Sequence, residues 1–168
     1  MKRIMFGLVV MLAVGGAPAQ ERAHGWIGKA VPPYPEGVEQ QQGSCIGDGA
    51  GGGPERICHH MVSVVFDPQS KLRTLLVVQE LPHFGKNSIG IVTDAFEPEE
   101  LDDAAWQVSV GACQQTGQDD GRIVAIVKPH DVEWLGARRA WRVDGEGRMQ
   151  TLPAKGVRCR NEGYGYDG

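Results

Sequence analysis

One stretch of the chain, residues 106–128, predicts a β-hairpin and limits the folds open to the rest. Its second arm, Arg122–Lys128, places Ile-Val-Ala-Ile-Val between two charged residues. Such an unbroken, β-branched run is typical of a central strand that is covered on both faces. The first arm, Trp106–Cys113, alternates apolar with small or polar side chains, as a half-buried strand does. Asp120-Gly121 can supply the positive φ angles of the turn between the arms.

Shorter strand-like runs lie on both sides of this hairpin, separated by turn residues. They are Ile57–Asp67, Leu72–Leu81, Ser88–Phe96, Trp134–Val143, Arg148–Leu152 and Val157–Cys159. Consecutive short strands joined by short turns usually pair antiparallel. We therefore predict a mainly β fold: a single antiparallel sheet-based domain with little helix, built as a meander, a sandwich or a partly closed barrel.

Two of the segments around the hairpin are ambiguous. Residues 132–143 can be a short helix capped by Asp131 or a strand. Leu135, Ala137, Trp141 and Val143 would share one strand face, with Arg139 as an inward-pointing exception, so we favour the strand. The acidic segment Glu97–Asp103 predicts a solvated connection, with room for one helical turn after Pro98. It lacks the alternating aspartates of a calcium loop.

The start of the chain has the layout of a secretory signal peptide. A basic end, an apolar run and Ala17-Pro-Ala19 follow one another, which predicts cleavage after Ala19 and a periplasmic or secreted protein. The alternative, a membrane anchor, is disfavoured because the apolar run is short. Cleavage removes Lys2 and Arg3 and takes the formal net charge from −4 to −6. An acidic domain without a later apolar span predicts neither nucleic-acid binding nor stable membrane insertion after cleavage.

Composition and cysteines divide the chain further. We expect a signal peptide at 1–19, a Pro/Gly-rich extended lead-in rather than a sheet strand at 20–44, and a disulfide-bonded β domain at 45–168. The four cysteines of an exported chain favour two disulfides, with three possible pairings. We favour Cys45–Cys58, which closes a glycine-rich loop, and Cys113–Cys159, which ties the hairpin to the last strand.

The sequence shows no motif for catalysis. No serine lies in Gly-x-Ser-x-Gly, and the cysteines are expected to be oxidised, so we predict no catalytic residue, no cofactor and no metal. The alternative is a metal-binding protein or a hydrolase that uses His59, His60 and His130. Against it, adjacent histidines on a strand point to opposite faces, and neither His-x-His nor His-Glu-x-x-His spacing is present.

The segment that follows the hairpin is the predicted interaction site. Pro129 leads the chain rigidly out of its most apolar strand. A tryptophan beside charged residues is a frequent composition of interface anchors. The residues of this site are Lys128, His130, Asp131, Glu133 and Trp134. The opposing interpretation is that Trp134 packs under the sheet and the charges merely solvate a turn.

Lys128-Pro-His-Asp131 resembles part of the loop carried by the Ivy family of periplasmic lysozyme inhibitors. Cysteines bracket the motif in that family, whereas Val127 and Val132 flank it here. The resemblance covers four residues and implies a polar loop, on a stiff sheet, that plugs an enzyme cleft. We therefore expect a small, exported, non-catalytic binding protein, inhibitor-like in one version, whose partner is a protein or another ligand of the cell envelope. A purely structural envelope component is a further alternative.

Overall fold

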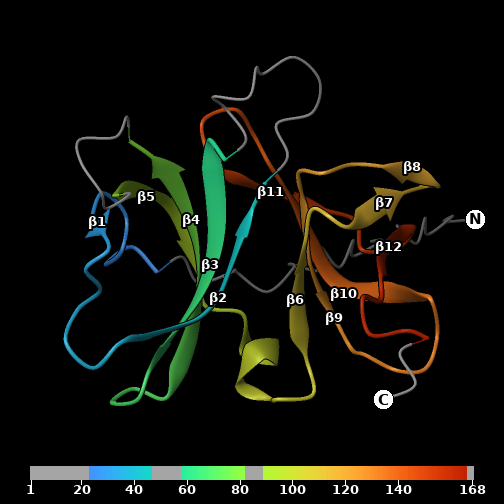
Figure 1. The fold of residues 1–168 in the computed structure, drawn as a ribbon, viewed down its shortest axis with the longest axis horizontal. Coiled ribbons are helices and arrows are strands. Elements are labelled where there is room, and N and C mark those ends of the chain that lie inside the picture. Colours follow the sequence, from blue (N-terminus) through green and yellow to red (C-terminus); the bar gives the residue numbers. More distant parts are fainter. Residues whose placement is uncertain (1–22, 47–57, 82–88, 166–168) are drawn as a thin grey trace, which may run out of the picture.

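The computed structural model describes residues 23–46, 58–81 and 89–165, which form two antiparallel β-sheets (Figure 1). The first sheet has the strand order β1-β5-β4-β3-β2. Its strands are β1 (Ala30–Val31), β2 (Glu39–Cys45), β3 (His60–Asp67), β4 (Leu72–Glu80) and β5 (Gly90–Phe96). The second sheet has the order β6-β9-β10-β12-β7-β8, and β11 also pairs with β10. Its strands are β6 (Gln107–Val110), β7 (Cys113–Gln115), β8 (Gln118–Asp119), β9 (Ile123–Val127), β10 (Trp134–Val143), β11 (Met149–Leu152) and β12 (Val157–Arg160).

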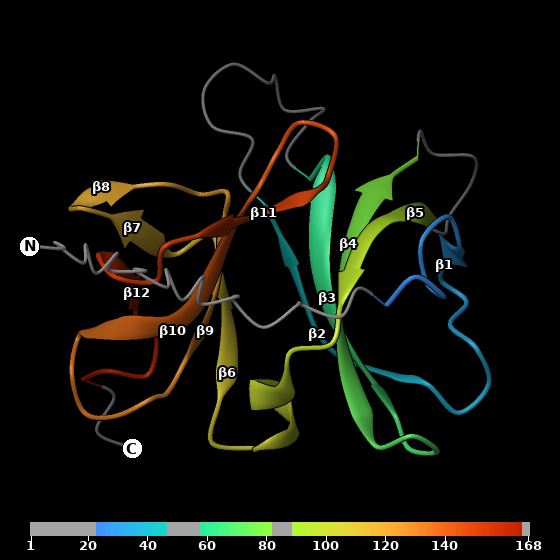
Figure 2. The same ribbon diagram turned by 180° about the vertical axis from the view of Figure 1, so that it is seen from behind.

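This architecture confirms the predicted mainly β fold with antiparallel pairing and little helix. Within the described ranges there is no α-helix, and one 3₁₀ turn, η2 (Glu99–Asp102), begins after Pro98 as the sequence indicates. The two sheets pack face to face as a sandwich, and the second sheet curls into half of a barrel (Figures 1 and 2). The signal peptide expected at 1–19 and the glycine-rich loop at 47–53 lie outside the described residues.

Apolar side chains form three layers, one between the sheets and one on the far face of each. The central layer joins Leu75 and Phe96 of the first sheet to Ile126 and Trp141 of the second. Trp141 is 1% exposed, and its ring centre lies 6.2 Å from that of Phe96. A second layer, inside the curl of the second sheet, surrounds Cys113–Cys159. The third layer lies on the outer face of the first sheet, which therefore needs a cover of its own.

The segment before β3 supplies that cover, and the prediction that residues 20–44 stay outside the sheet is wrong. β1 pairs with β5 and β2 pairs with β3, while Trp26 and Tyr34 pack on the third layer. β2 could not be predicted from the sequence because Glu-Gln-Gln-Gln-Gly-Ser-Cys shows no apolar alternation. Such a pattern suits an edge strand with one neighbour and no fully buried face, and β2 is one.

The predicted hairpin is confirmed in its pairing and wrong in its turn. β6 pairs with β9 from Gln107↔Val127 to Val110↔Val124, and all five β9 residues are buried. Gly111, at φ 74°, ends β6, and the chain then forms a second hairpin, β7–β8, before β9. The tight turn is Thr116-Gly117, with φ angles of 51° and 86°, rather than Asp120-Gly121. β7 pairs with β12 instead of continuing β6.

Both predicted disulfides are present. Cys45 joins Cys58 across a sequence separation of 13 residues, and Cys113 joins Cys159 across 46. The second bond follows from strand register, because β7 and β12 place Cys113 opposite Cys159. Both cysteines of this pair are buried inside the curl of the second sheet, at 2% and 0% exposure.

Residues 134–143 form a strand, as favoured, but they do not share one face. The register of β10 against β9 shifts by one residue between Ala137 and Arg139. This β-bulge turns the later residues over. Leu135 therefore packs inside the curl, whereas Trp141 and Val143 pack between the two sheets. Arg139 is in phase with Trp141, so it lies on the face that meets the first sheet, as the inward-pointing exception that the sequence predicts.

The acidic connection is solvated only in part. Glu99 is exposed, but Glu100 has only 8% of its side chain exposed. Its carboxylate lies 2.7 Å from Arg139 Nε, so the ion pair fastens η2 to β10. The prediction that both glutamates are solvated is wrong for Glu100. The bulge in β10 explains this, because it aims Arg139 at η2.

Candidate functional site

The predicted interaction residues lie together on the connection from β9 to β10. Lys128, His130, Asp131 and Glu133 are exposed, and Trp134 is half-buried at the first position of β10. We refer to residues 128–133 as the β9–β10 loop. The loop lies beside the segment that follows β12, near the carboxyl end of the chain (Figures 1 and 2). Exposed charges on a structured loop can bind a partner, provided that the loop keeps its shape.

Asn161 fixes the backbone of this loop. Its Nδ2 donates to the carbonyl oxygens of His130, at 2.9 Å, and Val132, at 3.0 Å. Its backbone N–H donates to Glu133 O at 2.8 Å. Within the loop, Val132 N–H donates to His130 O at 2.7 Å. These bonds satisfy three loop carbonyls with one residue, so the loop has a defined shape without being buried.

The imidazole of His130 is also oriented by the loop. Its Nδ1 lies 2.9 Å from the carbonyl oxygen of Lys128. A carbonyl oxygen only accepts, so Nδ1 carries the proton in this contact. The ring is held against its own loop, and Nε2, on the other side of the ring, takes no part in that contact. The arrangement combines a fixed ring with an exposed side chain.

The role of Asn161 in holding the loop was not predicted from the sequence. Its Oδ1 accepts from Gly163 N–H at 3.2 Å, a local turn contact of the kind that Asn before Gly suggests. The contact to His130 crosses 31 residues, which no local pattern indicates. β12 carries Asn161 to the loop, because Arg160 pairs with Trp134 at the start of β10. The disulfide at Cys159 anchors that strand two residues before Asn161.

Two adjoining cavities extend from the base of the loop. Lys128 Nζ lies 5.9 Å from the ring centre of Trp106, whose side chain lines the larger cavity, of about 390 Å³. The smaller, of about 140 Å³, is lined by Asn161 and by Leu135. Both cavities are lined by Gln42, Gln107, Val108 and Glu162. The strands on either side of the loop and the segment at Asn161 therefore line a polar groove, although residues 128–133 do not themselves line it.

The three histidines of the alternative site do not meet at one place. His59 and His60 contact each other, with Nδ1 atoms 3.2 Å apart and ring planes at 81°, but His130 does not join them. The expectation that they point to opposite faces is wrong, because His59 precedes β3 and does not follow strand alternation. His60 is 1% exposed, and His130 belongs to the loop of the other sheet. Among the residues described, no three His, Cys, Asp or Glu side chains gather as metal ligands.

In the part of the chain that the structure describes, no helix has the length and apolar character needed to cross a membrane. The two disulfides are consistent with an oxidising, extracytoplasmic compartment. Comparison with models of protein families, with curated proteins and with solved structures gave no match to this chain.

Proposed function

We propose that this protein is exported, folds in the periplasm or outside the cell, and binds a protein or another envelope ligand through the β9–β10 loop without catalysing a reaction. The signal-peptide-like start and the two disulfides support export. The described residues offer two stiff sheets as the scaffold and one polar loop as the working surface.

One observation carries the proposal: Asn161 holds the backbone of the loop while the side chains of His130, Asp131 and Glu133 remain exposed. A loop that is ordered before binding loses less conformational entropy when it meets a partner. The side-chain contacts from Asn161 go to backbone carbonyls, so they order the loop without occupying the side chains of His130, Asp131 and Glu133.

The resemblance of Lys128–Asp131 to an inhibitor loop suggests a class of partner. Glycosidase clefts hold a pair of carboxylates on either side of the scissile bond. The loop presents the Lys128 ammonium, which donates hydrogen bonds to carboxylates, and the His130 imidazole, whose Nε2 donates to a carboxylate when the ring is protonated. We therefore propose a peptidoglycan-cleaving glycosidase as the partner, with the loop as the inserted element.

The test is inhibition of peptidoglycan hydrolysis by purified lysozymes. We expect the wild-type protein to inhibit and His130→Ala to weaken inhibition by at least about tenfold, because a lost charge-assisted hydrogen bond costs about 1.5–3 kcal/mol. Lys155→Ala is the matched control, since Lys155 is exposed and lies on the β11–β12 connection. Equal inhibition by wild type and His130→Ala would contradict the role of the loop. A wild-type protein that leaves every lysozyme active would contradict the choice of partner.

A further inference from the structure

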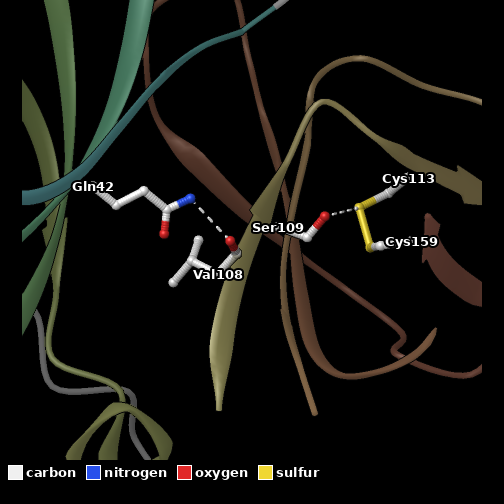
Figure 3. Close-up of a disulfide and its surroundings, with 5 residues drawn as sticks. All are labelled: Gln42, Val108, Ser109, Cys113 and Cys159. Carbon is white, nitrogen blue, oxygen red and sulfur yellow. Dashed lines mark hydrogen bonds between the residues drawn. A yellow bond between two sulfur atoms is a disulfide. The ribbon is translucent and has the colours of Figure 1, made fainter. Parts of the chain in front are cut away.

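The two sheets each leave one edge strand at the same opening of the sandwich. β2 ends the first sheet and β6 ends the second, and among the described residues no backbone pairing joins the two strands. A side chain bridges the opening, since Gln42 Nε2 donates to Val108 O at 3.0 Å (Figure 3). Edge strands present backbone donors and acceptors that another strand can pair with.

The register of β6 shows which of its backbone groups face the opening. Gly111 N–H donates to Ile123 O at 3.0 Å, which makes Val110↔Val124 a pair without mutual hydrogen bonds. Pairs alternate along an antiparallel ladder, so Gln107 and Ser109 bond to β9. The N–H and C=O groups of Val108 and Val110 then point away from β9. The bond from Gln42 to Val108 O agrees with this assignment.

The same reasoning applies to β2. Ile46 N–H donates to His60 O at 2.9 Å, so Cys45↔Met61 is also a pair without mutual hydrogen bonds. The backbone groups of Gly43 and Cys45 therefore point away from β3. A Cβ built at Gly111 would lie 3.8 Å from Cys45 O, which places this end of β2 against the end of β6. Since Gln42 meets Val108 and Cys45 meets Gly111, the two edges run in the same direction.

The two cavities lie on opposite faces of β6. Val108 points to the layer between the sheets, and the larger cavity on that side has Leu101 and Trp106 in its lining. Ser109 points the other way, with its hydroxyl 3.6 Å from Cys113 Sγ, and lines the smaller cavity (Figure 3). Successive side chains of an added strand would point alternately to these two faces.

We propose that this opening binds an extended polypeptide segment of a partner protein, which adds to β6 as an antiparallel strand. Its backbone pairs with Val108 and Val110, and its amide replaces that of Gln42 on Val108 O. One apolar side chain enters the cavity at Trp106, and the next residue, small or polar, enters the cavity at Ser109. The N–H and C=O groups of Val108 and Val110 that face away from β9 stand in strand register and so select a polypeptide over other ligands. The inference does not depend on the β9–β10 loop being the binding loop.

The test uses a phage-displayed library of linear heptapeptides selected on the intact protein, followed by titration of an enriched synthetic peptide. We expect Val110→Pro to weaken binding at least about tenfold, because it removes an N–H that faces the opening. Proline is tolerated at such positions of edge strands. Gln42→Ala should strengthen binding, because the competing amide is gone. Lys155→Ala, remote from the opening, is the control and should bind as wild type does.

Amide hydrogen exchange keeps the proposal testable if Val110→Pro does not fold. In the free protein, Val108 and Val110 should exchange faster than Gln107 and Ser109, and peptide should slow only the first two. Failure to enrich any peptide, peptide binding that leaves both amides unchanged, or protection of both amides in the free monomer would overturn the proposal. Amide protection of Val108 and Val110 that rises with protein concentration, together with a dimer in solution, would also overturn the proposal. It would show that a second copy of this chain occupies the opening.

Discussion

The connections at the two ends of β10 differ: the one after it is bonded to the core, and the one before it is held at the surface. After β10, the turn 144–148 and the first residue of β11 are joined to the first sheet: Thr93 Oγ1 donates to Gly147 O at 2.8 Å, and Asp94 accepts from Met149 N–H at 2.9 Å. Before β10, the β9–β10 loop receives its backbone contacts from Asn161 and leaves its charged side chains exposed. Both segments are polar in sequence, so polarity alone does not distinguish a structural turn from a surface available for binding.

Removing the Cys113–Cys159 disulfide should have the largest effect and should loosen the loop end of β10 selectively. In the chain-entropy description, a closed loop of this length contributes about 4 kcal/mol, against about 3 kcal/mol for Cys45–Cys58. The variant Cys113→Ala/Cys159→Ala should also speed amide exchange at Asn161, because β12 loses its anchor. Urea unfolding of this variant and of Cys45→Ala/Cys58→Ala provides the measurement. Greater destabilisation by the second variant would contradict the ranking.

Asp94→Ala should destabilise the protein by about 2–3 kcal/mol, because it leaves the buried Met149 N–H without its acceptor. The loss should be visible in urea unfolding, while the β9–β10 loop keeps its amide-exchange pattern. Asp131→Ala is the matched control at the other end of β10, and its exposed carboxylate should change stability by less than about 0.5 kcal/mol. Equal losses in the two variants would remove the distinction between the two ends.

Asn161→Asp should cost about 1 kcal/mol of stability and disturb the loop more than the fold. Aspartate keeps an acceptor for Gly163 N–H but has no donor for the carbonyls of His130 and Val132. We expect faster amide exchange at Val132 and weaker partner binding, with the exchange of β11 unchanged. Binding at the wild-type level despite a loosened loop would show that the order of the loop is irrelevant to binding.

Asp144→Asn should have the smallest effect, and that effect should depend on pH. Burial opposes ionisation of Asp144, but the backbone N–H groups of Arg148 and Glu146 outweigh it and hold its pKa below the ordinary value of 3.8. A lowered pKa means that the charge stabilises the fold above the unfolded value and loses this effect as the pH falls through the folded value. We expect a loss of less than about 0.5 kcal/mol at pH 7, limited by solvent screening, that shrinks as the pH falls below 3.8 and through the lowered pKa of the folded state. A difference that grows at low pH in urea unfolding would be inconsistent with this sign.

The parts of the fold that local patterns determine could be predicted. The unbroken run Ile123–Val127 is central and buried, and the two disulfides are the pair favoured from the even number of cysteines and their places in the chain. Features that depend on contacts between distant residues could not be predicted. β2 is polar because it lies at an edge, and the bulge after Ala137 depends on the match between β10 and β9. The exposed loop residues Lys128, His130, Asp131 and Glu133 were named from composition, whereas Asn161, the residue that holds the loop, was not.

Site-specific photo-crosslinking compares the two ends of β10 directly. A photoreactive phenylalanine analogue replaces Asp131 in the loop or Glu146 in the turn, both exposed, in cells that export the protein. The proposal predicts that one envelope partner is crosslinked from position 131, that excess wild-type protein suppresses this product, and that position 146 gives none. A partner captured from position 146 alone, or no product from position 131, would contradict the assignment of the β9–β10 loop as the binding surface.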